Sequence, residues 1–267
     1  MKMKIGIIGC GNMGQALLSG ILAEGYTHKS NILCSDRDKK KAAFVRSRFK
    51  ASICSTNSQL FDRCDPIIIA VKPSDVQAVL AEAHLPLRDK LVISVCAGIG
   101  TRLFERILGK VAVVRVMPNM PARIGEGISA VALGRFAKER DKKVTFSIFS
   151  CVGEVVEIKE RLMDAVTAIS GSGPAYFFYL VEKLIDAAEE LGISRNIAQR
   201  LAIKTALGSA SLLNKSEEDA QVLRRKVTSK GGTTQAAFAV FQRRGLEGIL
   251  NAAFKAAAKR SKELEAK

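Results

Sequence analysis

Short apolar runs alternate with helix-length segments over the N-terminal part of the chain. The strand-like runs are residues 4–8, 31–36, 66–71, 91–95 and 111–117. Strands that alternate with helices are typical of a parallel sheet with helices packed on both faces. The pattern therefore predicts an α/β, doubly wound sheet.

Two further strand-like runs extend this region. Residues 127–134 and 153–158 are apolar and flank a helix-length stretch near 138–150. Strand signals end after about residue 161, so we expect the first domain to span 1–161.

The rest of the chain has a helical pattern. Apolar residues recur every three or four positions after Pro174, which fits a first helical turn, and Gly192 ends the run. Segments 196–213 and 246–264 are Ala-rich and apolar over much of their circumference, more than a small domain can bury alone. We therefore expect an all-α dimerisation domain over 162–267 that packs against a second subunit. A self-contained helical bundle is the alternative.

A glycine motif joins the first strand to the first helix. Gly9 permits a tight turn, Gly11 lets the backbone approach a pyrophosphate, and Gly14 allows close helix packing. The helix N-terminus attracts the anion. This context predicts a Rossmann-type dinucleotide site, in which the motif residues Gly9, Cys10, Gly11, Asn12, Met13 and Gly14 contact the cofactor.

The end of the second strand carries two opposing cues about the cofactor. Asp36 lies about 20 residues after the glycine motif, where a carboxylate accepts the ribose 2′-hydroxyl of NADH. Arg37 and the lysines at 39–41 favour a 2′-phosphate instead. We expect NADPH to be preferred over NADH.

Composition narrows the remaining possibilities. The net charge is +16, but it is spread along the chain and Trp is absent, which disfavours a nucleic-acid partner. The six cysteines form no CxxC pair, so we expect neither a metal site nor a disulfide framework. No apolar run approaches the roughly 20 residues of a membrane span, and the start resembles no signal peptide. We therefore expect a cytoplasmic protein without a membrane partner.

Histidine is too scarce for ordinary carbonyl reduction. His28 and His84 both fall outside the expected strand ends, where a histidine acid would be needed. An imine nitrogen can be protonated before hydride arrives and needs only a hydrogen-bonding partner. Small hydroxyl groups suffice for such a substrate.

The segment VTSKGGTTQ, residues 227–235, supplies those hydroxyls between two predicted helices. Backbone N–H groups and a hydroxyl at a helix N-terminus would hold a carboxylate, and the next hydroxyl would meet a ring nitrogen. The carboxylate cradle would be formed by Ser229, Gly231, Gly232 and Thr233, and Thr234 would meet the nitrogen. Capping hydroxyls at an interhelical turn are the alternative reading.

These segments together resemble the pyrroline-5-carboxylate reductase family. The matching motifs are GCGNMGQA, AVKP, VCAG, RVMPNMP, AISGSGPAY and VTSKGGTTQ, in the family's order and over nearly the whole chain. The resemblance implies hydride transfer from NAD(P)H to the C=N carbon of 1-pyrroline-5-carboxylate, which gives L-proline in the last step of its biosynthesis. It also implies a homodimer, in some members a larger ring of dimers, with an active site completed at the subunit interface.

The resemblance also implies roles for individual residues. Cofactor-side contacts would be Asn57, Ala70, Val71, Lys72, Pro73, Cys96, Ala97 and Gly98. The wall beneath the nicotinamide would be Met117, Pro118 and Asn119. The catalytic hydroxyl would be that of Thr234. One departure is Lys230, which stands where the family usually has proline and both loosens the loop and adds a cation.

Three other functions compete with this one. A β-hydroxyacid dehydrogenase shares the glycine motif, but its lysine base would correspond to Lys183, which lies in an amphipathic run and reads as a surface charge. A reductase of another cyclic imino acid would use the same site. A regulatory module that only senses NAD(P)H would not need the loop at 227–235.

Overall fold

A computed structural model describes residues 3–84, 86–87 and 89–265. The chain forms two compact units. The first comprises residues 1–172 with 256–267, and the second comprises 173–255. This division differs from the expected domain boundary after residue 161. That boundary stays a proposal. Each unit is described by itself.

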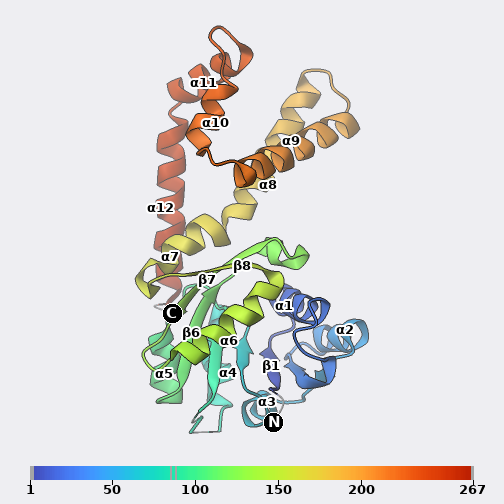
Figure 1. Cartoon of the computed structure of the whole chain (residues 1–267), viewed down its shortest axis with the longest axis vertical. Coiled ribbons are helices and arrows are strands. Elements are labelled where there is room, and N and C mark those ends of the chain that lie inside the picture. Colours follow the sequence, from blue (N-terminus) through green and yellow to red (C-terminus); the bar gives the residue numbers. More distant parts are fainter. Residues whose placement is uncertain (1–2, 85, 88, 266–267) are drawn as a thin grey trace. The chain divides into compact units, whose positions relative to one another are not determined.

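The first unit is built on one eight-stranded sheet of order β3-β2-β1-β4-β5-β6-β7-β8. Its strands are β1 (Ile5–Ile8), β2 (Ile32–Ser35), β3 (Ser52–Ile53), β4 (Ile67–Ile69), β5 (Leu91–Ser94), β6 (Ala112–Met117), β7 (Gly127–Leu133) and β8 (Gly153–Glu157). Every run predicted as a strand is confirmed, and only the two-residue β3 lacked a sequence signal. Figure 1 shows the sheet with its helices.

One strand pair departs from the expected parallel sheet. The strand β7 runs antiparallel to β6, whereas all other neighbouring pairs are parallel. The connection 118–126 is too short for a parallel crossover, which needs a dozen or more residues. The chain therefore turns back on itself after β6, and α6 then carries it over to the parallel strand β8.

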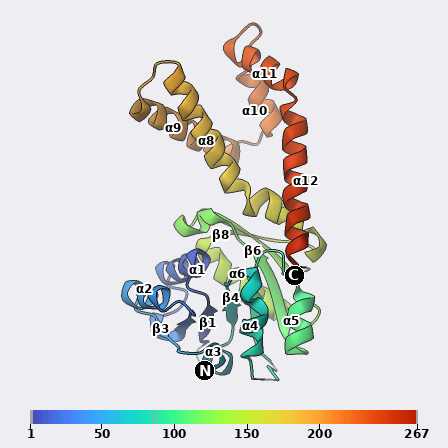
Figure 2. The same cartoon turned by 180° about the vertical axis from the view of Figure 1, so that it is seen from behind.

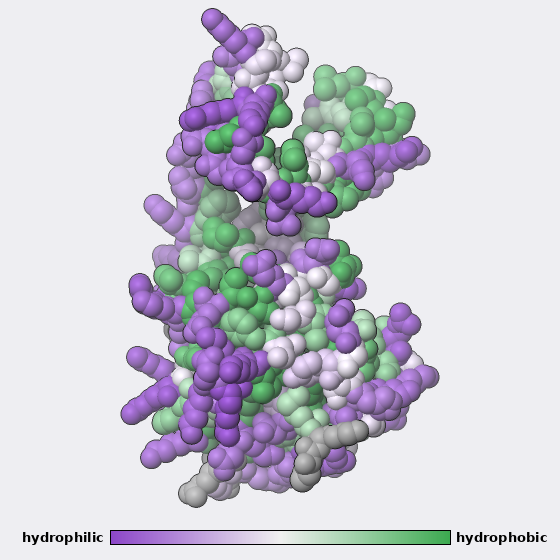
Figure 3. Space-filling model, viewed as in Figure 1, coloured by the Kyte–Doolittle hydropathy of each residue, from purple (hydrophilic) through white to green (hydrophobic). Residues whose placement is uncertain are grey.

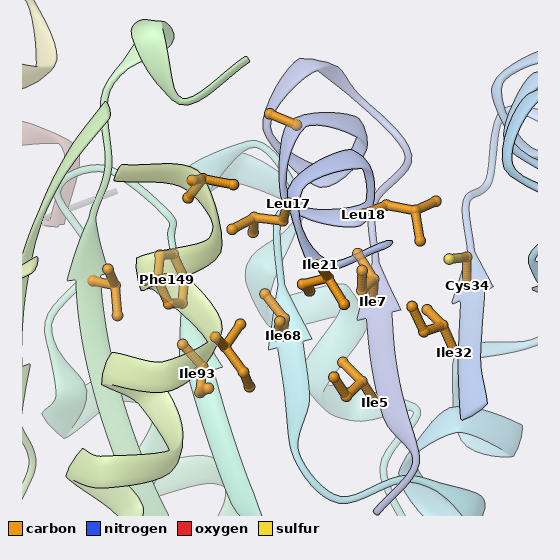
Figure 4. Close-up of a cluster of buried hydrophobic side chains, with 14 of the residues drawn as sticks. Ile5, Ile7, Leu17, Leu18, Ile21, Ile32, Cys34, Ile68, Ile93 and Phe149 are labelled. Atoms are coloured by element: carbon orange, nitrogen blue, oxygen red, sulfur yellow. The ribbon is translucent and has the colours of Figure 1, made fainter. Parts of the chain in front are cut away.

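Helices cover both faces of this sheet, as a doubly wound fold requires. One face carries α1 (Asn12–Ala23), α2 (Lys39–Phe49) and α6 (Glu139–Phe149), and the other carries α3 (Asn57–Arg63), α4 (Val76–Ala81) and α5 (Thr101–Leu108). Figure 4 shows the first core, where side chains from α1 and Phe149 pack onto the isoleucines of β1, β4 and β5. The central strands are buried throughout, which is typical of parallel sheets.

Short helical turns complete the first unit. They are η1 (Lys29–Asn31), η2 (Pro73–Asp75), η3 (Met120–Ile124), η4 (Ser150–Val152), η5 (Glu160–Leu162), α7 (Met163–Val166) and the π-helical turn η6 (Thr167–Gly171). The C-terminal part of α12 also belongs to this unit. Figure 2 shows the same elements from behind.

Among its described residues, the second unit contains helices joined by loops and no strand. Its helices are α8 (Gly173–Glu190), α9 (Arg195–Lys215), α10 (Ala220–Lys226), α11 (Thr233–Arg243) and the first part of α12 (Leu246–Glu265). Pro174 lies in the first turn of α8, and Gly192, at φ +89°, follows its end, as predicted. A small core of Ile185, Ala198 and Ala202 joins α8 to α9.

Many large apolar side chains of the helical unit remain uncovered. They include Phe177, Phe178, Leu180, Ile197, Leu201, Leu207, Leu212 and Ile249, each more than half exposed. Figure 3 shows hydrophobic residues gathered at the surface of the α8 and α9 helices. Such a surface favours a second subunit over a self-contained bundle. No helix in the described part of the chain is long and apolar enough to cross a membrane.

Candidate active site

The three motif glycines lie in the loop after β1 and the first turn of α1 and differ in how much space a side chain would have. Gly9 has φ +107°, and a Cβ there would lie 2.7 Å from the carbonyl carbon of Ala70. A Cβ on Gly14 would overlap the carbonyl oxygen of Gly9, so only glycine lets the helix pack this closely. A Cβ on Gly11 would meet nothing within 4 Å. The backbone is therefore open at the one position where a ligand is expected to approach it.

A cavity of about 570 Å³ opens beside this loop. It brings together ten residues predicted for the cofactor: Gly9, Gly11, Asn12, Met13, Asp36, Arg37, Asn57, Ala70, Val71 and Lys72. Lys41, from the lysine group predicted to favour a 2′-phosphate, lines it too, as do residues that the sequence did not single out, among them Gln15, Asp75, Val79 and Glu82. Its position at the carboxyl ends of β1, β2 and β4 is where open α/β sheets bind ligands.

Asp36 is engaged by the protein backbone. Its Oδ2 accepts a hydrogen bond from the Cys10 amide at 2.7 Å, and its Oδ1 accepts one from the Asp38 amide, also at 2.7 Å. The carboxylate thus holds the glycine loop against the end of β2. Each carboxylate oxygen can accept a further hydrogen bond, so the residue can still meet a ribose hydroxyl.

Two cations stand at the same end of the cavity. The Arg37 guanidinium pairs with Asp75 at 2.8 Å, yet its side chain is 77% exposed, and Lys41 reaches the cavity from α2. The ion pair orients Arg37 at the cavity rim, where a free guanidinium edge is available for a phosphate.

Asn57 is fixed in the cavity wall by hydrogen bonds that were not predicted from the sequence. The Ser35 hydroxyl donates to its Oδ1 at 2.6 Å, and its side-chain amide donates to Glu82 at 2.8 Å. Glu82 lies 25 positions away and also accepts the Asn57 backbone amide at 3.1 Å. Sequence spacing carries no signal for a partner so distant, which only the fold brings close.

The turn 96–98 lies behind the cavity. The Cys96 thiol is buried and donates to the carbonyls of Val71 at 3.4 Å and Ile69 at 3.5 Å, and burial raises the pKa of this thiol to about 11. Gly98, at φ +74°, packs against the end of α12. Neither these residues, nor Ala97 between them, nor Pro73 lines the cavity, and their cofactor contacts stay a prediction.

Met117 is the last residue of β6, and Pro118 and Asn119 follow it at the carboxyl end of the strand. The Asn119 side chain accepts the Ile128 amide at 3.0 Å and donates to the Ser170 hydroxyl at 3.5 Å. Gly171 leaves room for the Met117 methyl group, which a Cβ there would strike. The MPN motif is therefore packed against Ser170 and Gly171 of the AISGSGPAY motif, both of which belong to the first unit.

In the second unit, residues 227–232 connect α10 to α11. Gly231 has φ +72°, and its amide donates to Oε1 of Gln235 at 2.6 Å. The Gly232 amide donates to the Ser229 carbonyl at 3.1 Å. Two of the three amides expected to bind a carboxylate are thus held within the loop itself.

The other expected groups of this loop are free. Among the described residues, the Thr233 amide and the hydroxyls of Ser229 and Thr234 have no hydrogen-bonding partner. Thr233 is the first residue of α11, so its amide lies at the helix N-terminus, where the helix dipole favours an anion. A Cβ on Gly232 would strike the Ser229 hydroxyl, so glycine there lets Ser229 lie beside the helix end.

Other titratable residues lie outside the cavity. His28 and His84 bond to Ser30 and Asp62 near the surface, as expected. Lys183 is 47% exposed, and its hydrogen bonds to Asp186 and Glu182 raise its pKa. It is a surface charge, and its pKa moves away from what a general base needs.

The cysteines and a second cavity add no candidate chemistry. All six cysteines are free thiols, and no metal-binding group of His, Cys, Asp or Glu occurs within 3–84, 86–87 and 89–265. A more open cavity of about 720 Å³ lies along α5, but none of the predicted site residues lines it.

Comparison with known proteins agrees with this geometry. Residues 160–264 match the family model described as pyrroline-5-carboxylate reductase dimerisation, and residues 4–98 match NADP oxidoreductase coenzyme F420-dependent. The chain is 36% identical to a pyrroline-5-carboxylate reductase of Synechocystis, with 99% of each chain covered. It is 38% identical to that of Pseudomonas aeruginosa, over 98% of this chain and 96% of the relative.

A solved structure is similar over the same length. The crystal structure of Plasmodium falciparum pyrroline carboxylate reductase with NADP bound superposes with a TM-score of 0.91. The two sequences are 34% identical, and 99% of this chain and 98% of the other are covered.

Proposed function

The chain belongs to the pyrroline-5-carboxylate reductase family, and from this premise we propose that it reduces 1-pyrroline-5-carboxylate to L-proline with NADPH. The similarity over the full length carries the choice of substrate. The open backbone at Gly11 beside the 570 Å³ cavity supports the cofactor. We further propose that the enzyme acts in the cytoplasm, in the last step of proline biosynthesis.

The residues of the cavity fit a dinucleotide. The amides at the start of α1, beside the open Gly11, would hold the pyrophosphate, since a helix N-terminus attracts an anion. Arg37 and Lys41 would bind the 2′-phosphate, while Asp36 holds the glycine loop in place. When bound, the cofactor supplies the hydride. The protein supplies its binding and orientation.

The loop 227–235 would hold the substrate. The Ser229 hydroxyl and the Thr233 amide have free hydrogen-bonding capacity at the start of α11, where they would bind the substrate carboxylate. Gly231 and Gly232 would shape this loop. The Thr234 hydroxyl would then meet the imine nitrogen.

This assignment makes a strong acid unnecessary. The substrate nitrogen is basic enough to arrive protonated, so one hydroxyl that fixes its position suffices. The wall of Met117, Pro118 and Asn119 would exclude water beneath the nicotinamide, with Asn119 held by Ile128 and Ser170. Catalysis would come mainly from holding donor and acceptor face to face.

The active enzyme would be a homo-oligomer. The chain carries a dimerisation domain, and its helical unit exposes large apolar side chains. We propose that dimers form through these helices, that the active site is completed at the subunit interface, and that the dimers assemble into a larger ring. Sedimentation of a monomer at working concentration would contradict this part.

The reaction is tested by the loss of NADPH absorbance on mixing the purified protein with 1-pyrroline-5-carboxylate, with proline identified by mass spectrometry. The expected result is rapid oxidation that depends on both protein and substrate. A β-hydroxyacid with NADP⁺ is the matched control for the rival activity. Turnover of the hydroxy acid but not of the imine would overturn the proposal.

A further inference from the structure

The C-terminal end of α12 packs directly against the turn that follows β5. A Cβ on Gly98 would lie 2.6 Å from the carbonyl oxygen of Ser261 and 2.7 Å from the Cβ of Leu264. Gly98 has φ +74°, and Ser261 is only 3% exposed. The helix backbone therefore touches the backbone of the turn, with no side chain of the turn between them.

A polar network fixes the last turns of α12 in this position. The Ser261 hydroxyl donates to Oδ1 of Asp164 at 2.8 Å. Asp164 pairs with the guanidinium of Arg115 at 3.6 Å, and Arg115 is 5% exposed on β6. Removing a partner from such a buried group is costly, because it leaves a charge uncompensated.

Arg115 also lies close to Glu160, which binds the first residue of α5. Arg115 lies 3.9 Å from Glu160, whose carboxylate accepts hydrogen bonds from the Thr101 amide at 2.7 Å and the Thr101 hydroxyl at 2.8 Å. Thr101 is the first residue of α5, three positions after Gly98. The turn is thus held at Gly98 by α12 and at Thr101 by Glu160, and Arg115 joins the two attachments.

The turn 96–98 also supports the wall of the cavity. The Cys96 thiol donates to the carbonyls of Ile69 and Val71, and Val71 lines the cavity. Ala70, between them, packs against Gly9 so closely that no Cβ fits at Gly9. Contacts therefore run without interruption from α12, through the turn 96–98, to the glycine loop.

We propose that Ser261 and Asp164 are positioning residues that lock the turn 96–98 and thereby hold the cofactor cavity in its binding shape. Neither residue lines the cavity. This inference rests on the proposed function for its cofactor, NADPH, but its structural part does not depend on any activity.

Alkylation of two buried thiols can show whether the turn 96–98 is released. Cys96 lies in the turn, and Cys64 lies elsewhere in the same unit, at the end of α3. Burial raises the pKa of both thiols to about 11, so their alkylation in the folded protein reports access rather than intrinsic reactivity. A local release exposes Cys96 alone, whereas general unfolding exposes both.

The test compares the full-length protein with Ser261→Ala. Iodoacetamide labelling of each cysteine is followed by mass spectrometry without cofactor, and the NADPH dissociation constant is measured by fluorescence. We expect Cys96 to label about tenfold faster with Cys64 unchanged, as the loss of one hydrogen bond to a charged group would give. NADPH should bind several-fold more weakly.

Two further variants separate the causes. Ser47→Ala removes a hydroxyl that donates to the Phe44 carbonyl on exposed α2, and should change neither thiol. A chain that ends at Lys262 keeps Ser261 but loses Leu264, and should also release Cys96. If Ser261→Ala does not fold, this shorter chain carries the test.

The outcomes are distinct. Unchanged Cys96 labelling in folded Ser261→Ala, or a parallel rise at Cys64, would overturn the proposed lock, and unchanged labelling in the shorter chain would overturn it where Ser261→Ala does not fold. A wild-type protein that binds no NADPH would instead contradict the proposed cofactor, while the labelling result would still decide whether the turn is locked.

Discussion

Alanine at two glycines of the first loop should damage two different properties. At Gly14, a Cβ would meet the Gly9 carbonyl oxygen well inside the 3.0 Å that such contacts respect. At Gly11, a Cβ would enter open space, and the backbone there, at φ −74° and ψ −169°, suits alanine. The first change therefore acts on folding and the second on the ligand.

The magnitudes follow from these contacts. Overpacking by one methyl group costs about 3 kcal/mol when the backbone must move, and alanine returns about 1 kcal/mol of helix propensity at Gly14. Gly14→Ala should thus lose about 2 kcal/mol, which lowers Tm by about 6 °C. Gly11→Ala should keep or slightly raise the stability. Its methyl group would block the pyrophosphate and weaken NADPH binding by about 100-fold, or about 2.7 kcal/mol.

Both variants are measured by thermal unfolding followed by circular dichroism and by NADPH fluorescence titration. The wild-type protein is the reference in each assay. A Gly14→Ala protein with the wild-type Tm would refute the packing argument. A Gly11→Ala protein that binds NADPH as tightly as the wild type would show that the pyrophosphate does not approach this backbone.

Four further outcomes are expected. Thr234→Ala should slow kcat by about 100-fold, as for the loss of one positioned donor, and a wild-type rate would remove its assigned role. Arg37→Ala should lower the ratio of kcat/KM for NADPH over NADH by about tenfold, since a charge-assisted contact to the 2′-phosphate is lost; an unchanged ratio would assign the preference elsewhere. Lys230→Pro should keep or lower KM for the imine because proline stiffens the loop, and a large rise in KM would contradict the alignment of this loop. Burial raises the pKa of Cys64 and Cys96 from 9.0 to about 11, so unfolded thiols lose their protons first. The free energy of unfolding should therefore fall as pH rises from about 9 to about 11, with a smaller slope in Cys64→Ala, and chemical denaturation across this range would test it.

The sequence predicted those parts of the fold that depend on local pattern. The strands and the glycine loop were readable because apolar runs and glycines with positive φ leave a local signature, as at Gly9. The strand β7 was located correctly, but its direction was not predicted. The direction follows from a connection too short for a crossover; the spacing of the two runs contains this length, but the prediction of a parallel sheet did not use it.

The candidate site was predictable only in part, for a related reason. Motif residues such as Asn57 could be named, but Glu82, which fixes Asn57, lies 25 positions away, directly after the end of α4. The buried Arg115 likewise appeared as one more residue of an apolar strand. Its partners Glu160 and Asp164 lie on a segment that the fold alone brings to β6.

The most direct test of the central claim follows the hydride itself. The protein is incubated with 1-pyrroline-5-carboxylate and NADPH deuterated at C4 of the nicotinamide, and the proline formed is examined by mass spectrometry and NMR. Direct reduction of the C=N bond predicts one deuterium at C5 of proline, the former imine carbon. Proline without deuterium, or no proline from a folded and oligomeric protein, would contradict the account.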